Sequence, residues 1–131
     1  VRWLVDGDTI RVVSVTNDPK GQVDTLVQQE SLRFNLWASK STGWVGYFSK
    51  AILPIAQYID YVKVYNYNTD TKTFTERWTD DFDSFNSARW SKGDWQMEWV
   101  MEATKNVTIE DGNLVMRLTK EPIYSTPTAI K

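Results

Sequence analysis

Apolar and polar side chains alternate along much of this chain, and short turn signals interrupt the alternation. A period of two suits a β-strand with one covered face, because successive side chains point to opposite sides of a sheet. Val1–Val5 and Thr9–Val15 flank one Asp-Gly pair, and Asn106–Ile109 and Leu114–Thr119 flank another. Asp-Gly favours the tight turn of a β-hairpin. The sequence therefore predicts two hairpins, the second with Leu114, Met116 and Leu118 facing inward.

The strongest alternation occurs in Tyr58–Tyr67, where Val62 and Val64 share the face opposite the tyrosines. We expect one continuous strand there. The only stretch with helical character is Lys50–Tyr58, and Pro54 within it argues against a helix because proline removes a backbone donor. Many short strands with little helix predict an all-β sandwich.

Composition limits the chemistry that this fold can carry. The 131 residues include no histidine and no cysteine, which excludes Ser-His-Asp and Cys-His catalysis and thiolate metal sites. The 15 basic and 17 acidic residues give a net charge of −2, so no basic surface for nucleic acid is expected. No apolar run is long enough to cross a bilayer, so a membrane is not an expected partner either.

The residues Leu32–Trp37 combine two faces of different character. The even-numbered residues are apolar and suit a core, whereas Arg33, Asn35 and Trp37 would share the other face of a strand. An aromatic ring can stack on the C–H face of a sugar, and fixed donors can bind its hydroxyls. A solvated outer face with one half-buried tryptophan is the alternative.

Another candidate surface surrounds Lys92 and Gly93. Trp90 and Trp95 flank this turn, and a plain surface loop has no need of two tryptophans. A ligand platform and core packing both explain the pair.

Paired carboxylates are the remaining route to glycoside hydrolysis. A retaining glycosidase holds its two carboxyl groups about 5–5.5 Å apart, and three alternating acids on a strand would provide such a pair. The chain contains no such run, and Asp81 with Asp83 comes closest. Glu98 and Glu102 share a strand parity but are explained more simply as an exposed pair. No catalytic residue is therefore predicted.

Several motifs together resemble glycoside hydrolase family 16, in particular its 1,3-1,4-β-glucanases (lichenases). Thr79–Trp95 is similar to the opening tract of that family, and Asn106–Thr119 is similar to the hairpin that follows it. The segments that resemble the carboxyl-terminal strands of the family are Val1–Gly7, Leu32–Trp37, Trp44–Gly46 and Ile59–Tyr65.

The order of these motifs is the reverse of the usual one, as in the circularly permuted lichenases. The resemblance implies part of a concanavalin-like jelly-roll β-sandwich with antiparallel sheets. In this one incomplete structural domain, residues 1–68 resemble the carboxyl-terminal half, residues 69–75 form a linker at the permutation junction, and residues 76–131 resemble the amino-terminal part.

The catalytic strand of that family, Glu-x-Asp-x-Glu, does not occur in this chain. We therefore expect the substrate-binding half of an endo-1,3-1,4-β-glucanase, inactive by itself. The alternatives are a non-catalytic β-glucan-binding module and a structural β-domain whose tryptophans are core residues.

The resemblance also implies ligands and partners. A structural calcium ion would be held by the side chain of Asp60 and by backbone oxygens of Asp81 and Gly112. The expected partners are a mixed-linkage β-glucan and the missing upstream half of the enzyme, and the expected location is outside a bacterial cell. The implied substrate-binding residues are Arg33, Asn35, Trp37, Trp44, Trp90, Lys92, Gly93 and Trp95.

Overall fold

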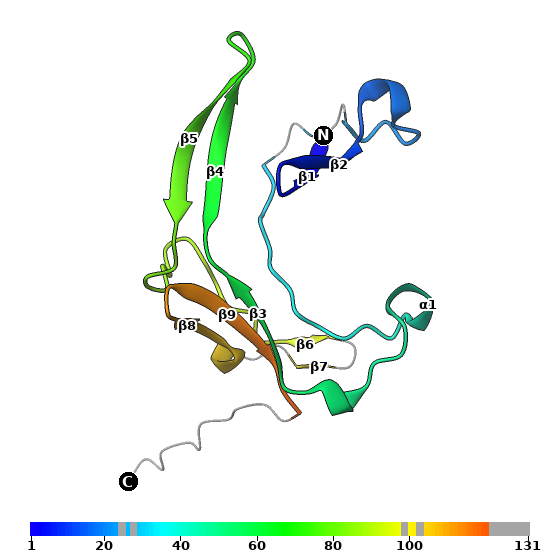
Figure 1. Ribbon diagram of the computed structural model, residues 1–131, viewed down its shortest axis with the longest axis vertical. Coiled ribbons are helices and arrows are strands. Elements are labelled where there is room, and N and C mark those ends of the chain that lie inside the picture. Colours follow the sequence, from blue (N-terminus) through cyan, green and yellow to red (C-terminus); the bar gives the residue numbers. More distant parts are fainter. Residues whose placement is uncertain (24–25, 27–28, 98–99, 102–103, 121–131) are drawn as a thin grey trace. The chain divides into compact units, whose positions relative to one another are not determined.

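The computed structural model describes residues 1–23, 26, 29–97, 100–101 and 104–120. Antiparallel strands dominate this part of the chain (Figure 1), which confirms the predicted all-β class. The helical segments are the single-turn helix α1 (Thr42–Val45) and the 3-10 turns η1 (Val15–Asn17), η3 (Lys50–Ile52) and η4 (Thr104–Asn106). No described helix has the length and apolar character to cross a membrane. The strands are β1 (Arg2–Val5), β2 (Asp8–Val12), β3 (Ile55–Ile59), β4 (Val62–Asn68), β5 (Thr73–Asp80), β6 (Gln96–Met97), β7 (Val100–Met101), β8 (Val107–Glu110) and β9 (Asn113–Leu118).

The chain divides into two compact units, Val1–Phe34 and Asn35–Lys131. In the first unit, β1 and β2 pair antiparallel around Asp6 and Gly7, so the first predicted hairpin is confirmed. Both turn residues have positive φ, +52° at Asp6 and +88° at Gly7. This is the backbone that a two-residue hairpin turn requires, which is why aspartate and glycine stand there.

The second unit is organised around β9, which lies between β3 and β8 in a three-stranded sheet (Figure 1). The second predicted hairpin, β8–β9, is confirmed, and Asp111 and Gly112 at its turn again have positive φ. Leu114, Met116 and Leu118 are buried as predicted. Val115, on the opposite face, has no exposed surface, so both faces of β9 are covered.

The predicted continuous strand Tyr58–Tyr67 is wrong, because two different strands share these residues. β3 pairs with β9, and its last partner is Ile59 with Leu114. β4 pairs instead with β5, beginning with Val62 and Asp80. The chain passes from one sheet to the other at Asp60. The alternation itself is retained, since Val62 and Val64 are half-buried and their neighbours Tyr61, Lys63 and Tyr65 are exposed.

The predicted strand Leu32–Trp37 is also wrong. These residues belong to no strand, and no strand in the described part of the chain pairs with them. Leu32 is 52% exposed, whereas Phe34 and Leu36 are half-buried. Alternating apolar and polar residues indicate which face of a strand would be buried. A strand forms, however, only where a neighbouring strand completes the backbone hydrogen bonds.

The segment expected as a linker, residues 69–75, joins two paired strands. Thr73–Thr75 already belong to β5, where Thr73 pairs with Asn68, so only residues 69–72 form the turn of the β4–β5 hairpin. The side chain of Asn68 accepts hydrogen bonds from the backbone N–H groups of Asp70 and Thr71 at 2.9 and 3.0 Å. The division into two family-like halves around this junction stays a prediction.

A bidentate ion pair links the two strands of the β8–β9 hairpin. Arg117 donates from Nη2 to Glu110 Oε2 at 2.5 Å and from Nη1 to Oε1 at 2.6 Å, and Thr108 Oγ1 donates to Oε1 at 2.6 Å. The hydrogen bonds from Arg117 and then Thr108 lower the pKa of Glu110 from 4.5 to about 2. Glu110 is therefore a charged hydrogen-bond acceptor at pH values above this lowered pKa.

The depressed pKa of Glu110 predicts a loss of stability in acid. Because the folded state binds this proton more weakly than the unfolded state, the contribution of Glu110 is present above pH 4.5 and is lost as the pH falls toward about 2. We expect Glu110→Gln to flatten the fall in urea midpoint across this window. Glu76→Gln, at an exposed position of β5, is the control. Equal acid sensitivity of wild type and Glu110→Gln would contradict the prediction.

Candidate functional site

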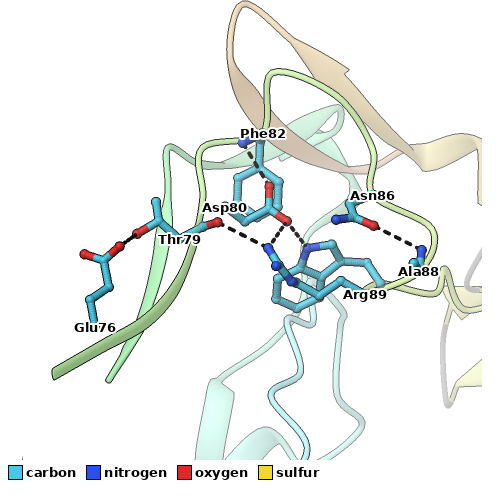
Figure 2. A network of polar contacts seen from close by, with 8 residues as sticks. Glu76, Thr79, Asp80, Phe82, Asn86, Ala88 and Arg89 are labelled. Carbon is cyan, nitrogen blue, oxygen red and sulfur yellow. Dashed lines mark hydrogen bonds and ion pairs between the residues drawn. The ribbon is translucent and has the colours of Figure 1, made fainter. Parts of the chain in front are cut away.

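A buried carboxylate stands where β5 ends. Asp80, 8% exposed, is paired with Val62 and is the last residue of the strand. Its Oδ2 accepts hydrogen bonds from Trp90 Nε1 at 2.7 Å and Arg89 Nη1 at 3.0 Å, and its Oδ1 accepts one from the backbone N–H of Phe82 at 3.2 Å (Figure 2). One side chain thus joins the end of the strand to residues of the next loop.

A turn at Asn86 directs the two donors back toward Asp80. The carbonyl oxygen of Asn86 accepts from the backbone N–H groups of Arg89 and Trp90 at 3.1 and 2.9 Å. Its side-chain oxygen accepts from the N–H of Ala88 at 3.1 Å (Figure 2). Asparagine favours such a turn because its side chain can bond to backbone two residues further on. Arg89 and Trp90 therefore leave the turn on the side where the carboxylate lies.

Aromatic packing surrounds this polar network. The Trp90 ring lies 6.1 Å from that of Trp78 in an edge-to-face arrangement and 5.9 Å from that of Phe82, whose side chain has no exposed surface. The guanidinium carbon of Arg89 lies 4.2 Å from the centre of the Trp78 ring. We call Trp78, Asp80, Phe82, Arg89 and Trp90 the Asp80 cluster.

The cluster keeps Asp80 ionised. Burial, the largest influence, raises the pKa of its carboxyl group, but the hydrogen bonds from Trp90, Phe82 and Arg89 together outweigh it. The net result is a pKa below the usual value. The three hydrogen-bond donors therefore stabilise the ionised form of Asp80.

The predicted group at residues 90–95 is divided by the structure. Trp90 is half-buried and packs within the Asp80 cluster. For this residue, the structure agrees with the alternative of core packing. Lys92 is half-buried too, with Nζ donating to the carbonyl oxygen of Val107 at 2.5 Å and lying 4.6 Å from the centre of the Phe85 ring. Gly93 is half-buried, whereas Trp95 is 53% exposed. Trp95 is the member of this group that offers an open ring; binding roles for all of them stay predictions.

Trp37 and Trp44 come together although they are seven positions apart in the sequence. Their ring centres are 6.4 Å apart with planes inclined by 57°. Trp37 is half-buried, and the next two residues, Ala38 and Ser39, are buried. Trp44 lies in helix α1, which follows these residues. It is 74% exposed, and its ring lies beside that of Trp37. The two side chains form an anchored aromatic pair with one open ring, which we call the Trp37–Trp44 pair.

The two remaining predicted binding residues, Arg33 and Asn35, are both exposed. Arg33 belongs to the first compact unit and Asn35 to the second.

The predicted metal residues share a region of backbone. Asp60 follows the last β3–β9 pair, Ile59 with Leu114, and Gly112 lies just before that pair in the β8–β9 turn. Asp81 follows Asp80, whose partner in β4 is Val62. Among the described residues, no three histidine, cysteine, aspartate or glutamate side chains gather closely enough to hold a metal ion. A cation there would need backbone oxygens as well as carboxylates.

Glu98 and Glu102, the two carboxylates considered for catalysis, lie outside the described residues. Asp80 and Arg89 were not predicted from the sequence. Their contact joins residues nine positions apart through a turn, and no spacing rule of strands or helices indicates it.

Comparison with known proteins finds a relative that matches almost the whole chain. The match is to a beta-glucanase of Fibrobacter succinogenes (strain ATCC 19169 / S85), with 42% identity over an alignment of 127 residues that covers 92% of this chain. The chain spans 35% of the length of that relative. No family model matches the chain. The sequence is thus similar to about a third of a bacterial beta-glucanase.

The Asp80 cluster predicts which aspartate of this region matters for stability. Asp80→Ala would remove the charged acceptor that Trp90 and Arg89 share, and we expect it to lower the free energy of unfolding by about 1–3 kcal/mol. Asp83→Ala, at an exposed position three residues on, should change it by less than about 0.5 kcal/mol. Urea unfolding measures both. Equal effects of the two substitutions would show that the network contributes nothing.

Proposed function

We propose that this chain is the substrate-binding part of an endo-1,3-1,4-β-glucanase of glycoside hydrolase family 16, of the circularly permuted kind. The observation that carries the proposal is the 42% identity to a beta-glucanase across 92% of the chain. The order of the family-like motifs in the sequence supports the finer assignment. The partner would be a mixed-linkage β-glucan, and the location would be outside a bacterial cell.

Binding of an uncharged glucan needs aromatic rings and hydrogen-bond donors in reach of solvent. Trp44 at 74% exposure and Trp95 at 53% meet the first need. The exposed Arg33 and Asn35 can supply donors to sugar hydroxyls. Trp90 and Lys92 would act by positioning, since their polar groups already bond within the protein.

Hydrolysis would depend on residues that this chain does not contain. Retention requires a nucleophile and an acid/base, and the Glu-x-Asp-x-Glu motif that carries them in the family is absent. We propose that the upstream half of the enzyme supplies this strand and completes the cleft. The alternative function is a non-catalytic β-glucan-binding module, which the same exposed tryptophans would serve.

The binding role predicts a specific loss in Trp44→Ala. Native electrophoresis in gels containing lichenan should show retardation of the chain, with about threefold to tenfold weaker affinity after this substitution, because one stacking surface is removed. Trp3→Ala, which removes a 42% exposed tryptophan of β1, is the matched control. Retardation that Trp44→Ala leaves unchanged would contradict the assigned site.

A lichenan hydrolysis assay separates the half-enzyme from the binding module. Reducing sugar should appear only when the chain is mixed with the upstream half of a beta-glucanase. No activity in the mixture, with binding intact, favours the module. Reducing sugar from the chain alone would overturn the half-enzyme proposal and direct attention to Glu98 and Glu102.

We also propose a structural calcium ion held by the side chain of Asp60 with backbone oxygens at Asp81 and Gly112. The two strand registers that bracket Asp60 support this set, since they bring the three backbones to one region. An oxygen-only set suits calcium, a hard cation. The ion would tie the end of β3 to the β8–β9 turn and to the start of the loop after β5.

Calcium at 100 times its dissociation constant should stabilise the chain by about 2.7 kcal/mol, because it binds the folded state alone. Thermal unfolding with calcium and with a chelator measures the difference. Asp60→Asn should abolish it, whereas Asp70→Asn, in the β4–β5 turn, should not. A stabilisation by calcium that survives in Asp60→Asn would refute this ligand set.

A further inference from the structure

One face of the β4–β5 hairpin carries a stripe of exposed aromatic side chains. The hairpin is the long green pair of strands in Figure 1, and its register pairs Tyr65 with Glu76 and Tyr67 with Phe74. Directly paired residues of an antiparallel ladder point to the same side. We define the aromatic stripe as Tyr61, Lys63, Tyr65, Tyr67, Phe74 and Glu76.

Contacts between side chains confirm that these residues share a face. The rings of Tyr67 and Phe74 are 4.9 Å apart, and Nζ of Lys63 lies 5.3 Å from the centre of the Tyr61 ring. A bulge between Val64 and Tyr65 in the register shifts the alternation of β5 by one residue. Thr79 can therefore donate to Glu76 Oε1 at 2.9 Å on this same side (Figure 2).

The other face of the hairpin carries the packed residues. Val62, Val64 and Trp78 are half-buried there, and Asp80 is buried. On the stripe, by contrast, Tyr61, Tyr65, Tyr67 and Phe74 are 57%, 47%, 52% and 69% exposed. The outer face of an antiparallel sheet is ordinarily polar. Four exposed aromatic rings on one face therefore indicate a binding surface.

We infer that the aromatic stripe is a second binding surface for an uncharged polysaccharide chain, in addition to the Trp37–Trp44 pair. Side chains on one face of a strand repeat about every 6.8 Å, so Tyr65 and Tyr67 present successive rings along a line. An extended sugar polymer offers successive C–H faces along a line as well. The choice of a β-glucan as that polymer rests on the proposed function.

The charges of the stripe favour a neutral ligand. Lys63 and Glu76 have opposite charge, so the surface has no net charge to attract nucleic acid or an acidic lipid headgroup. Their polar groups and the phenol hydroxyls can bind sugar hydroxyls beside the rings. Lysine and glutamate are depleted in the core of protein interfaces, so Lys63 and Glu76 among the rings argue against burial of this face under a protein partner.

The test compares substitutions on the two surfaces in gels containing lichenan. Tyr65→Ala/Tyr67→Ala should weaken retardation about threefold to tenfold, and the loss should add to that of Trp44→Ala, because the surfaces act independently. Tyr58→Ala, which removes a 63% exposed tyrosine of β3, is the matched control. Tyr65→Phe/Tyr67→Phe keeps both rings and should retain most of the binding. Urea midpoints and size-exclusion elution are recorded for every variant.

The outcomes separate the two proposals. Retardation weakened by Trp44→Ala but equal in the stripe variant and Tyr58→Ala overturns the second surface and leaves the proposed function standing. Weakening by the stripe variant alone supports the second surface and contradicts the site assigned to Trp44. Loss of binding together with conversion of a dimer to a monomer identifies the stripe as a contact between copies and overturns the inference. If the stripe variant unfolds, the Tyr65→Ser single variant is measured in its place.

Discussion

The second compact unit depends most on the hydrogen bonds that the ionised carboxylate of Asp80 accepts. This carboxylate stands at the end of β5, and its three hydrogen bonds reach Phe82, Arg89 and Trp90. Taking a charge out of water is costly, and it is tolerated here because each oxygen has a donor and Arg89 supplies a counter-charge. These hydrogen bonds fix the turn that ends at Trp90. Two residues further on, the ammonium group of Lys92 donates a hydrogen bond to the carbonyl oxygen of Val107 at the start of β8. Strand end, loop and neighbouring hairpin are therefore connected through polar contacts as well as through packing.

This arrangement sorts the aromatic residues into two classes with different uses. Trp78, Phe82 and Trp90 contact one another around Asp80 and stabilise the fold. Trp44, Trp95 and the aromatic stripe present their rings to solvent. The amino-acid composition does not distinguish the packed aromatic residues from the exposed ones, although only the exposed rings can stack on a sugar. A polysaccharide-binding role for the chain therefore depends on the exposed class, while the packed class sets the position of the loop that carries Trp95.

The similarity to a beta-glucanase extends over 92% of this chain but only 35% of that relative. The sheets of the described part are correspondingly small: three have two strands each and one has three. Every residue of β1 and β2 is exposed, including Trp3, Leu4 and Ile10. A two-stranded ribbon with apolar side chains exposed on it is marginally stable in water. Further strands beside these hairpins would cover such surface, which is consistent with the proposed half of a larger sandwich.

The sequence alone determined the features that arise from local chemistry. Asp6–Gly7 and Asp111–Gly112 specify tight turns through their positive φ, so both hairpins could be predicted, and the lack of histidine and cysteine limited the possible chemistry. The tertiary structure decided what depends on partners. Leu32–Trp37 alternates like a strand but pairs with none in the described residues, and Tyr58–Tyr67 is divided because two different neighbours, β9 and β5, supply its ladders. Contacts with residues distant in sequence likewise decided that Trp90 is half-buried and that Trp44 is exposed. A side chain's environment is set by residues distant in sequence, and alternation within one strand carries no information about them.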